Sequence, residues 1–251
     1  MKIEFLSYPA SSLYAYSKFK MKRVVEPELL DELSPDDPRA RRSRRDLRRV
    51  NFFMRNVEIV ERRLLKAFPD EPPRQIMELG AGDGTFMLQL ARKLSRQWGN
   101  VEIVLVDRLK TISLETVREL NQLGWRVEVV CADIFEWLPK CERADCVMAN
   151  LFLHHFEVDG LALLLRLAAA KSNVFLACEP RRSTLALAGA RLLGLIGCND
   201  VTRNDALVSV RAGFRGRELS ELWPTANVRR LDETNAGLFG HGFTATSFAA
   251  R

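Results

Sequence analysis

Three glycines at alternate positions, Gly80, Gly82 and Gly84, separate a short apolar run at residues 76–79 from an apolar helical pattern. Glycine adopts left-handed backbone conformations and leaves no side chain over a turn, so a flat ligand can lie against the peptide itself. A strand, a glycine turn and a helix form the first unit of a parallel α/β sheet, whose ligands bind at the carboxyl ends of the strands. We therefore expect an α/β domain with a binding site at this edge.

Polar residues close the strand patterns that follow. Asp107, Asp133 and Asn150 each end or follow an apolar, β-branched run, and Glu179 closes a fifth run. Because the carboxyl ends of parallel strands meet at one edge of a sheet, we expect these side chains around the glycine turn. A carboxylate such as Asp107 can accept hydrogen bonds from both hydroxyls of a ribose.

Glu78, the Gly-x-Gly-x-Gly spacing and the ordered strand ends together resemble the motifs of the class I S-adenosylmethionine-dependent methyltransferases. The dinucleotide fingerprint is Gly-x-Gly-x-x-Gly, so the tighter spacing disfavours a nicotinamide dehydrogenase. Residues 150–156, Asn-Leu-Phe-Leu-His-His-Phe, are similar to the branch that acts on quinones, phenols and polyketides. Adenine methyltransferases of DNA and RNA carry Asn/Asp-Pro-Pro-Tyr/Phe at this place, and residues 150–156 contain no proline.

The resemblance implies a Rossmann-like sheet of seven mostly parallel strands with an antiparallel C-terminal hairpin strand, and S-adenosyl-L-methionine as cofactor. It implies that Glu78 contacts the aminoacyl end of the cofactor, that Asp107 holds the ribose and that Asp133 holds the adenine. The residues expected to bind the cofactor are Glu78, Gly80, Ala81, Gly82, Gly84, Asp107, Arg108, Asp133, Ile134, Asn150 and Leu151.

The three histidines of the chain are the candidates for a general base. A phenol with a pKa near 10 is ionised to about one part in a thousand at neutral pH, so a positioned base can contribute on the order of 10²–10⁴ in rate. His154 and His155 follow the fourth strand pattern, and His241 lies between two glycines in the expected terminal hairpin. Adjacent helical residues point about 100° apart, so we expect only one of the first two to face the site. The sequence leaves open which histidine acts.

We divide the chain into a helical N-terminal lid, residues 1–71, and a cofactor-binding domain, residues 72–251. Three prolines within residues 69–73 stop helix and strand alike at this boundary. Lids of this kind expel water from the acceptor. Candidates for the inner face of the lid are Arg48, Asn51, Met54, Arg55 and Asn56, and candidates for an apolar wall are Tyr14, Tyr16 and Phe19.

Seven arginines lie within residues 39–49 of a chain whose net charge is +6. Leu47, Val50, Met54 and Val57 recur beside them at helical spacing, which places the arginines on the polar face of a packed helix. We interpret this face as solvated or salt-bridged and expect no nucleic-acid partner. The alternative is an RNA methyltransferase that binds phosphates with these arginines.

Five cysteines without a Cys-x-x-Cys pair, and no histidine at ligand spacing from a cysteine pair, predict reduced thiols and no metal site, with Cys131 and Cys178 as small core residues. We find no targeting segment and no apolar run near the roughly 18–20 residues of a membrane span. The sequence thus predicts a cytoplasmic methyltransferase of secondary metabolism with a small aromatic acceptor, phenolic or quinone-like, and O-methylation favoured over C-methylation. A non-catalytic ligand-binding protein of the same fold remains an alternative, and homo-oligomer formation is left open.

Overall fold

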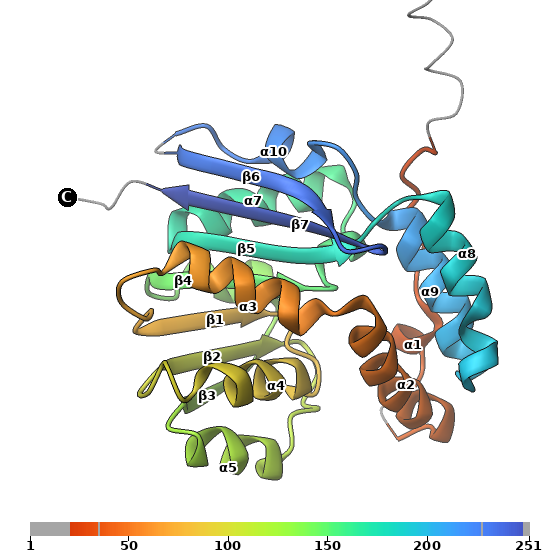
Figure 1. Ribbon diagram of the computed structural model, residues 1–251. Helices are drawn as coiled ribbons and strands as arrows, with labels where there is room; N and C mark the ends of the chain where they lie inside the picture. Colours follow the sequence, from red (N-terminus) through yellow and green to blue (C-terminus); the bar gives the residue numbers. More distant parts are fainter. Residues whose placement is uncertain (1–20, 35, 227, 248–251) are drawn as a thin grey trace, which may run out of the picture.

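A seven-stranded sheet forms the centre of the protein in the computed structural model, which describes residues 21–34, 36–226 and 228–247 (Figure 1). The strand order is β3-β2-β1-β4-β5-β7-β6. The first five strands are parallel, β7 runs antiparallel to β5, and β6 runs antiparallel to β7. The expected Rossmann-like sheet with an antiparallel C-terminal hairpin is confirmed. The strands are β1 (Gln75–Leu79), β2 (Glu102–Asp107), β3 (Arg126–Cys131), β4 (Ala144–Asn150), β5 (Ser172–Pro180), β6 (Val228–Ala236) and β7 (Gly240–Ser247).

Helices cover both faces of the sheet, with α3, α4 and α5 on one face and α7 and α10 on the other (Figure 1). The α-helices are α1 (Leu29–Glu32), α2 (Pro38–Met54), α3 (Asn56–Ala67), α4 (Thr85–Leu94), α5 (Leu114–Gln122), α6 (Ile134–Trp137), α7 (Val158–Lys171), α8 (Thr184–Leu192), α9 (Asp200–Ala212) and α10 (Glu218–Leu222). Two short 3₁₀ helices are η2 (Leu153–His155) and η3 (Leu193–Ile196). None of the helices in the described ranges is long and apolar enough to cross a membrane.

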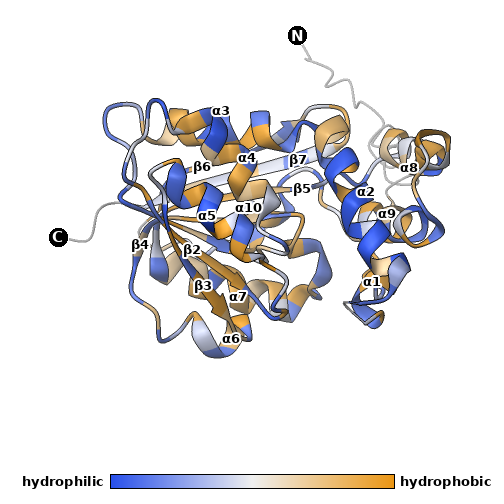
Figure 2. Cartoon of the chain, turned by 90° about the horizontal axis from the view of Figure 1, so that it is seen from below, coloured by the Kyte–Doolittle hydropathy of each residue, from blue (hydrophilic) through white to orange (hydrophobic). Residues whose placement is uncertain are grey.

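Alternate strand residues build two hydrophobic cores. On β1, Ile76 packs with α3 and α4, whereas its neighbour Met77 packs with α7 on the opposite face. The central strands β1, β2, β4 and β5 are therefore buried along nearly their whole length, and Figure 2 shows the apolar colour along β2. Cys178 is buried as expected, but the prediction for Cys131 was wrong, because it is exposed at the end of the edge strand β3.

The N-terminal helical pattern breaks at Arg55, whose φ of 57° ends α2 and starts α3. Val57, Val60 and Leu64 of α3 are buried in the same core as β1 and α4. The structure therefore places α3 with the sheet, although it lies on the N-terminal side of the boundary expected after residue 71. Only α1 and α2 of the N-terminal helices lie beyond the sheet edge.

A side-chain cap fixes the start of α9. The helix begins at Asp200 because Asn199 caps it and accepts a hydrogen bond from the Thr202 amide at 2.9 Å. This cap also fixes α9 to α2. The Asn199 amide donates to Asp46 at 2.8 Å, and Ser43 Oγ lies 2.8 Å from Thr202 Oγ1. As a result α1, α2, α8 and α9 gather at one end of the sheet (Figure 1), where they cover the candidate site.

Candidate active site

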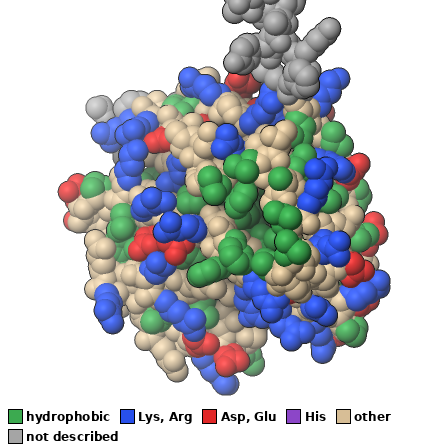
Figure 3. Space-filling view, turned by 45° about the vertical axis from the view of Figure 1, so that its right-hand side comes forward, with side chains coloured by type: hydrophobic (Ala, Val, Ile, Leu, Met, Phe, Trp, Pro, Cys, Tyr) green, Lys and Arg blue, Asp and Glu red, His purple; other side chains and the backbone are tan. Residues whose placement is uncertain are grey.

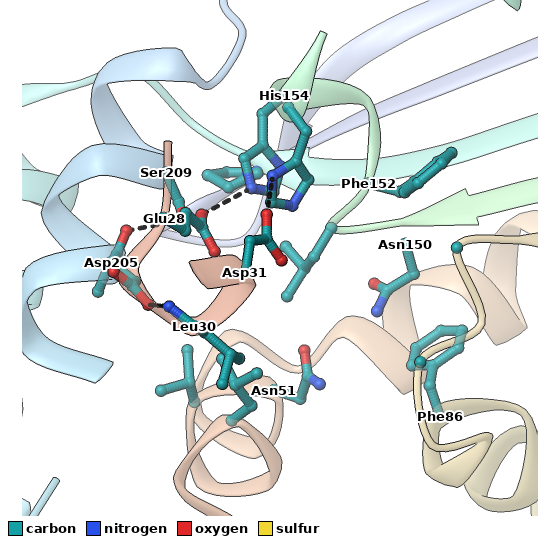
Figure 4. A pocket seen from close by; sticks show the side chains of 18 of the residues that line it. Glu28, Leu30, Asp31, Asn51, Phe86, Asn150, Phe152, His154, Asp205 and Ser209 are labelled. Carbon is teal, nitrogen blue, oxygen red and sulfur yellow. Dashed lines mark hydrogen bonds and ion pairs between the residues drawn. The ribbon is translucent and has the colours of Figure 1, made fainter. Parts of the chain in front are cut away.

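A cavity of about 960 Å³ lies between the carboxyl ends of the strands and the helices α1, α2, α8 and α9. One end is formed by the glycine turn after β1 and by the ends of β2 and β4. The other end is formed by η2 and by the segment that carries α1, and Figure 4 shows this end with Glu28 and His154 facing each other. The cavity therefore joins the expected cofactor motif to two of the three candidate histidines.

The glycine turn needs glycine for two separate reasons. Gly80 has a φ of 70°, and a Cβ atom there would lie 2.2 Å from Phe152 Cδ2, so a side chain has no room. Gly82 has a φ of 56°, but a Cβ atom there would meet nothing within 4 Å. Its positive φ disfavours other residues, and the open space beside it leaves the backbone accessible to a ligand.

Asp107 holds this turn in place. One carboxylate oxygen accepts from the Gly82 amide at 2.8 Å, and the other accepts from the Leu109 amide at 2.8 Å. A carboxylate has about four acceptor positions, so two remain for a ligand. Asp107 lines the cavity, and the geometry leaves it able to accept from a diol.

Glu78 is a buried carboxyl group with unused hydrogen-bonding capacity. Its side chain is almost completely buried, and its Oε2 atom has no hydrogen-bond partner in the described part of the chain. Burial raises the pKa of Glu78 well above its usual range, and the negative charges of Asp107 and Asp83 raise it further. A cationic group in the cavity would satisfy Oε2 and favour the ionised form. The amino group of S-adenosylmethionine is cationic and would give Glu78 the positively charged partner that it lacks. Glu78 therefore fits this cofactor.

Asn150 ends β4 and connects the floor of the cavity to the corner between α2 and α3. Its Oδ1 accepts from Asn56 Nδ2 at 3.1 Å, and the same nitrogen lies 3.0 Å from Asn51 Oδ1. Of the residues expected on the inner face of the lid, Arg48, Asn51 and Met54 line the cavity. Asn56 is buried and Arg55 is exposed. Tyr14, Tyr16 and Phe19 lie outside the described residues.

The remaining expected cofactor residues also meet at this end. Asp133 caps α6 by accepting from the Phe135 amide at 2.8 Å, and the buried Ile134 follows it. Gly84 caps α4 with a φ of 74° and is not among the lining residues. The cavity brings together Glu78, Gly80, Ala81, Gly82, Asp107, Arg108, Asp133, Ile134, Asn150 and Leu151.

His154 lies between two carboxylates. Its Nδ1 is 2.7 Å from Glu179 Oε2, and its Nε2 is 3.3 Å from Glu28 Oε1. Burial alone would lower the pKa of His154, but the hydrogen bonds and charges of the two carboxylates outweigh it and raise the pKa to about 9. For Glu28, burial would raise the pKa, but His154 lowers it to about 2. At neutral pH His154 is an imidazolium in an ion pair, which makes it a poor base.

His155 lies beside this ion pair in a different state. It is partly buried and lines the cavity, and its ring centroid lies 4.3 Å from that of His154. Burial and the positive charge of His154 lower the pKa of His155. Its Nδ1 lies 3.7 Å from an oxygen of Asp31, which is beyond hydrogen-bond distance. A neutral imidazole at a cavity wall can accept a proton.

His241, the third candidate, is placed away from the cavity. It is 1% exposed on β7, and its Nε2 lies 2.8 Å from Glu233 Oε1. Glu233 in turn accepts from the amides of Leu219 and Ser220, so the pair fixes α10 to β6. The expectation that His241 faces the acceptor therefore needs correction: β7 directs it toward α10 and β6.

Glu28 was not predicted as a site residue, and Glu179 was expected at the strand ends but was not assigned a role. Glu179 accepts from the amides of Phe152 and Leu153 at 3.0 and 2.9 Å and so shapes the turn that carries both histidines. The sequence feature that could identify Glu179 is its place as an acid near the end of a strand, which is also how Asp107 is found. Glu28 has no such signal, because it lies 126 residues from His154 in the sequence.

The segment that carries Glu28 is tied down on both sides. Arg23 donates to the carbonyls of Ala212 and Phe156 at 2.7 and 2.8 Å. Asp205 of α9 accepts from the amides of Leu29 and Leu30 at 2.8 and 3.0 Å. Residues 23–30 therefore form a strap across the end of the cavity that carries His154 and His155.

Glu28, His154 and His155 are close enough to hold a metal ion, since their ligand atoms lie within 4.8 Å of one another. A ligating histidine must offer a neutral nitrogen. His154, with a pKa of about 9 between two carboxylates, holds a proton on each nitrogen instead. We interpret the cluster as an ion pair, and the absence of a metal stays a prediction.

Three of the seven arginines within residues 39–49 form ion pairs, and Figure 2 shows how hydrophilic α2 is. Arg39 pairs with Asp37, Arg41 with Asp36 and Arg49 with Asp46, at 3.0, 2.7 and 2.9 Å. Arg42 donates to the carbonyl of Gly197 at 3.2 Å. The ion pairs of Arg39 and Arg41 join α2 to the two acids that precede it. The hydrogen bond of Arg42 joins α2 to the residue after η3.

Residues 76–171 match the family model described as "Methyltransferase domain". A comparison with curated proteins gave no match. Solved structures share the fold. One is the plantazolicin methyltransferase BpumL in complex with SAH (14% identity, TM-score 0.62, 85% of this chain and 92% of that chain). Another is an O-methyltransferase family protein from Burkholderia thailandensis (20% identity, TM-score 0.60, 86% and 62%).

A third is the magnesium protoporphyrin IX methyltransferase from Synechocystis PCC 6803 with bound SAH (12% identity, TM-score 0.52, 78% of this chain and 83% of that chain). The matched family model covers β1 to α7, which is the part that forms the glycine turn and the strand ends. The strand order, the glycine turn and the strand-end acids agree with it. The chain therefore contains a methyltransferase domain and has the fold that S-adenosylmethionine-dependent methyltransferases share.

Proposed function

We propose that this methyltransferase acts on a small, apolar aromatic acceptor, phenolic or quinone-like, and that it methylates an oxygen atom. The observation that carries the proposal is that Gly82, Asp107 and His155 line one cavity. Two of the proteins that share the fold are named as methyltransferases of plantazolicin and of magnesium protoporphyrin IX. That similarity supports a small molecule as acceptor.

We propose that Glu78, Asp107 and Asp133 hold the aminoacyl, ribose and adenine parts of the cofactor. When bound, S-adenosylmethionine supplies an electrophilic methyl group. The protein's own contribution is alignment, because donor and acceptor atoms must lie roughly 3–3.5 Å apart and in line. The buried Oε2 of Glu78 and the two free acceptor positions of Asp107 support these assignments.

We call the end of the cavity that carries His154 and His155 the acceptor end, and the end with the glycine turn the cofactor end. The side chains that line the acceptor end favour an aromatic acceptor. The ring of Phe156 packs edge-to-face against those of Phe135 and Phe152, with centroids 5.5 and 5.0 Å away. All three phenylalanines line the cavity, and Phe53, Leu193 and Phe239 line it further out. Edge-to-face packing is favourable for aromatic rings, so a ring in this space can join the existing cluster.

We propose His155 as the general base. It would accept the proton that the acceptor hydroxyl loses, while the neighbouring His154 stays protonated between Glu28 and Glu179. The lowered pKa of His155 keeps it neutral at pH 7, and its place on the cavity wall makes it accessible. The helices α1 and α2 would act as the lid, since they cover this end and connect to the floor through Asn51, Asn56 and Asn150.

Calorimetric titration with S-adenosylhomocysteine, with NADH as the control ligand, is the first test. Micromolar binding of S-adenosylhomocysteine alone is expected. A panel of phenols and hydroquinones is then incubated with a labelled methyl donor, beside total RNA. Label in a phenol supports the proposal, whereas label in RNA alone would replace it with the RNA methyltransferase alternative. Cofactor binding without any turnover would favour a ligand-binding protein.

A further inference from the structure

Exposed apolar side chains surround the open side of the cavity (Figure 3). Phe53, Leu192 and Ile196 line the cavity and are nevertheless 54%, 57% and 37% exposed, so the wall continues onto the surface. Leu195 at the tip of η3 is 83% exposed, and Phe52, whose ring contacts that of Phe53, is 76% exposed. We call these five residues the mouth patch. Side chains this exposed gain little from folding, and exposed apolar side chains gathered around an opening mark interaction sites.

Arginines flank the same tip. Arg42 reaches it from α2 and donates to the carbonyl of Gly197, directly after η3. Arg203 of α9 lies against it, with Nε 3.3 Å from where a Cβ atom of Gly194 would be. Arg191 precedes it on the last turn of α8 and is exposed. We call these three residues the arginine collar. Asp200 is the acid that follows the tip in the sequence, so the surface keeps a positive charge.

An apolar tip flanked by arginines has the chemistry of the membrane interface. Leucine and phenylalanine enter the boundary between head groups and acyl chains, while guanidinium groups bind lipid phosphates. Each basic residue near an anionic leaflet adds to the attraction. An acidic protein partner would use the collar but would leave Leu195 and Leu192 without a matching apolar layer.

We propose that the mouth patch and the arginine collar dock this protein on an anionic lipid bilayer. Leu195 and its apolar neighbours enter the interface, and the collar binds the phosphates. Docking does not depend on the proposed acceptor. One consequence does rest on it, because an apolar aromatic compound dissolved in the bilayer could enter the cavity directly at the mouth.

Sedimentation of the full chain with vesicles tests the proposal, using phosphatidylcholine alone or mixed with phosphatidylglycerol. We expect binding to the anionic vesicles only, weakened by added salt. Leu195→Ser should reduce the partition coefficient about tenfold, and Arg203→Gln about fivefold. Matched controls come from α5, on another side of the molecule (Figure 1), where Leu114 is 75% exposed and Arg118 is exposed. Leu114→Ser and Arg118→Gln should change nothing.

Several results would overturn the proposal. The wild-type protein could fail to bind vesicles, could bind both kinds equally, or could lose binding equally with the α5 control variants. A dimer that Leu195→Ser dissolves, without vesicle binding, would assign the patch to contact between two copies. Affinity for S-adenosylhomocysteine, measured on each variant, shows that the variants fold, and a normal value separates this test from that of the acceptor.

Discussion

The two ends of the cavity are built in different ways. The cofactor end uses backbone turns and strand-end side chains from residues 76–151, where each contact follows from the order of strands in the sheet. The acceptor end is assembled from segments far apart in the sequence, such as Glu28 of the strap and His154 of η2. One end therefore depends on the fold alone, and the other depends on a small cluster of charges that brings distant segments together.

The electrostatics of the two ends differ as well. At the cofactor end Glu78 lacks a partner, and its pKa is raised. At the acceptor end His154 and Glu28 have partners on every side, and their pKa values move apart to about 9 and about 2. The cofactor end, with an unpaired carboxyl group, can bind a cationic ligand. The acceptor end, where the charges of His154 and Glu28 are paired with each other, suits a neutral acceptor.

The largest expected effect is on kcat, and it comes from a substitution of His155 at the acceptor end. His155→Gln should lower kcat by about 10²–10⁴ and leave the affinity for S-adenosylhomocysteine unchanged, because the imidazole acts only on the acceptor. Steady-state kinetics on the best phenol and calorimetry measure the two quantities. His241→Gln serves as the matched control, since that histidine lies away from the cavity. If kcat of His155→Gln stays within threefold of wild type, His155 is not the base.

The next largest effect is on cofactor affinity, and it comes from a substitution at the cofactor end. Asp107→Ala should weaken S-adenosylhomocysteine binding about a hundredfold or more, because it removes a charged acceptor and also frees the Gly82 amide. Glu102→Ala, at the other end of β2, is the control and should bind normally. An affinity of Asp107→Ala within fivefold of the wild-type value would mean that the glycine turn forms without this acid.

These two residues also show how far the sequence alone could lead. Asp107 could be predicted because a strand-end acid after a glycine turn has one place to go in a parallel sheet. His155 could be named as a candidate but not separated from His154, because the difference arises from Glu28 and Glu179. The position of Glu28 depends on Arg23 and Asp205, whose contacts no local pattern encodes. The break at Arg55, which assigns α3 to the sheet, could not be predicted for the same reason.

The ion pair at the acceptor end should make stability depend on pH. His154 has a folded pKa near 9 against about 6.5 unfolded, so its contribution is complete below pH 6.5 and is lost as pH rises through 9. Glu28, near 2 when folded, contributes above its unfolded pKa and loses that contribution as pH falls toward 2. The shared pair is worth about 1–3 kcal/mol. The melting temperature should therefore fall by several degrees between pH 6.5 and 9.

His154→Gln isolates this effect from the other titrating groups. The variant should melt lower than the wild type at pH 6.5, and the gap should close as the pH approaches 9. Differential scanning calorimetry at matched ionic strength measures both curves. A gap that stays constant with pH would show that His154 is neutral in the folded protein and contributes only through packing.

A smaller effect tests the unmet charge of Glu78. Because its pKa is raised in the free protein, a bound cationic amino group should ionise it and release up to about one proton at pH 7. Calorimetry of S-adenosylhomocysteine in buffers of different ionisation enthalpy counts the protons. Glu78→Gln should abolish the release. Equal heats in all buffers with the wild-type protein would place the amino group elsewhere.

The smallest expected effect concerns the cluster of Glu28, His154 and His155, whose spacing would also suit a metal ion. A proton and a metal compete for the same imidazole nitrogen, and two flanking carboxylates favour the proton on His154. EDTA should therefore leave kcat unchanged within error, and added Zn²⁺ should not raise the melting temperature. If EDTA removed the activity and Mn²⁺, Mg²⁺ or Zn²⁺ restored it, the assignment of paired charges to the acceptor end would be wrong. The acceptor end would then be the one with an unmet charge, and His154 would serve as a ligand oriented by Glu179.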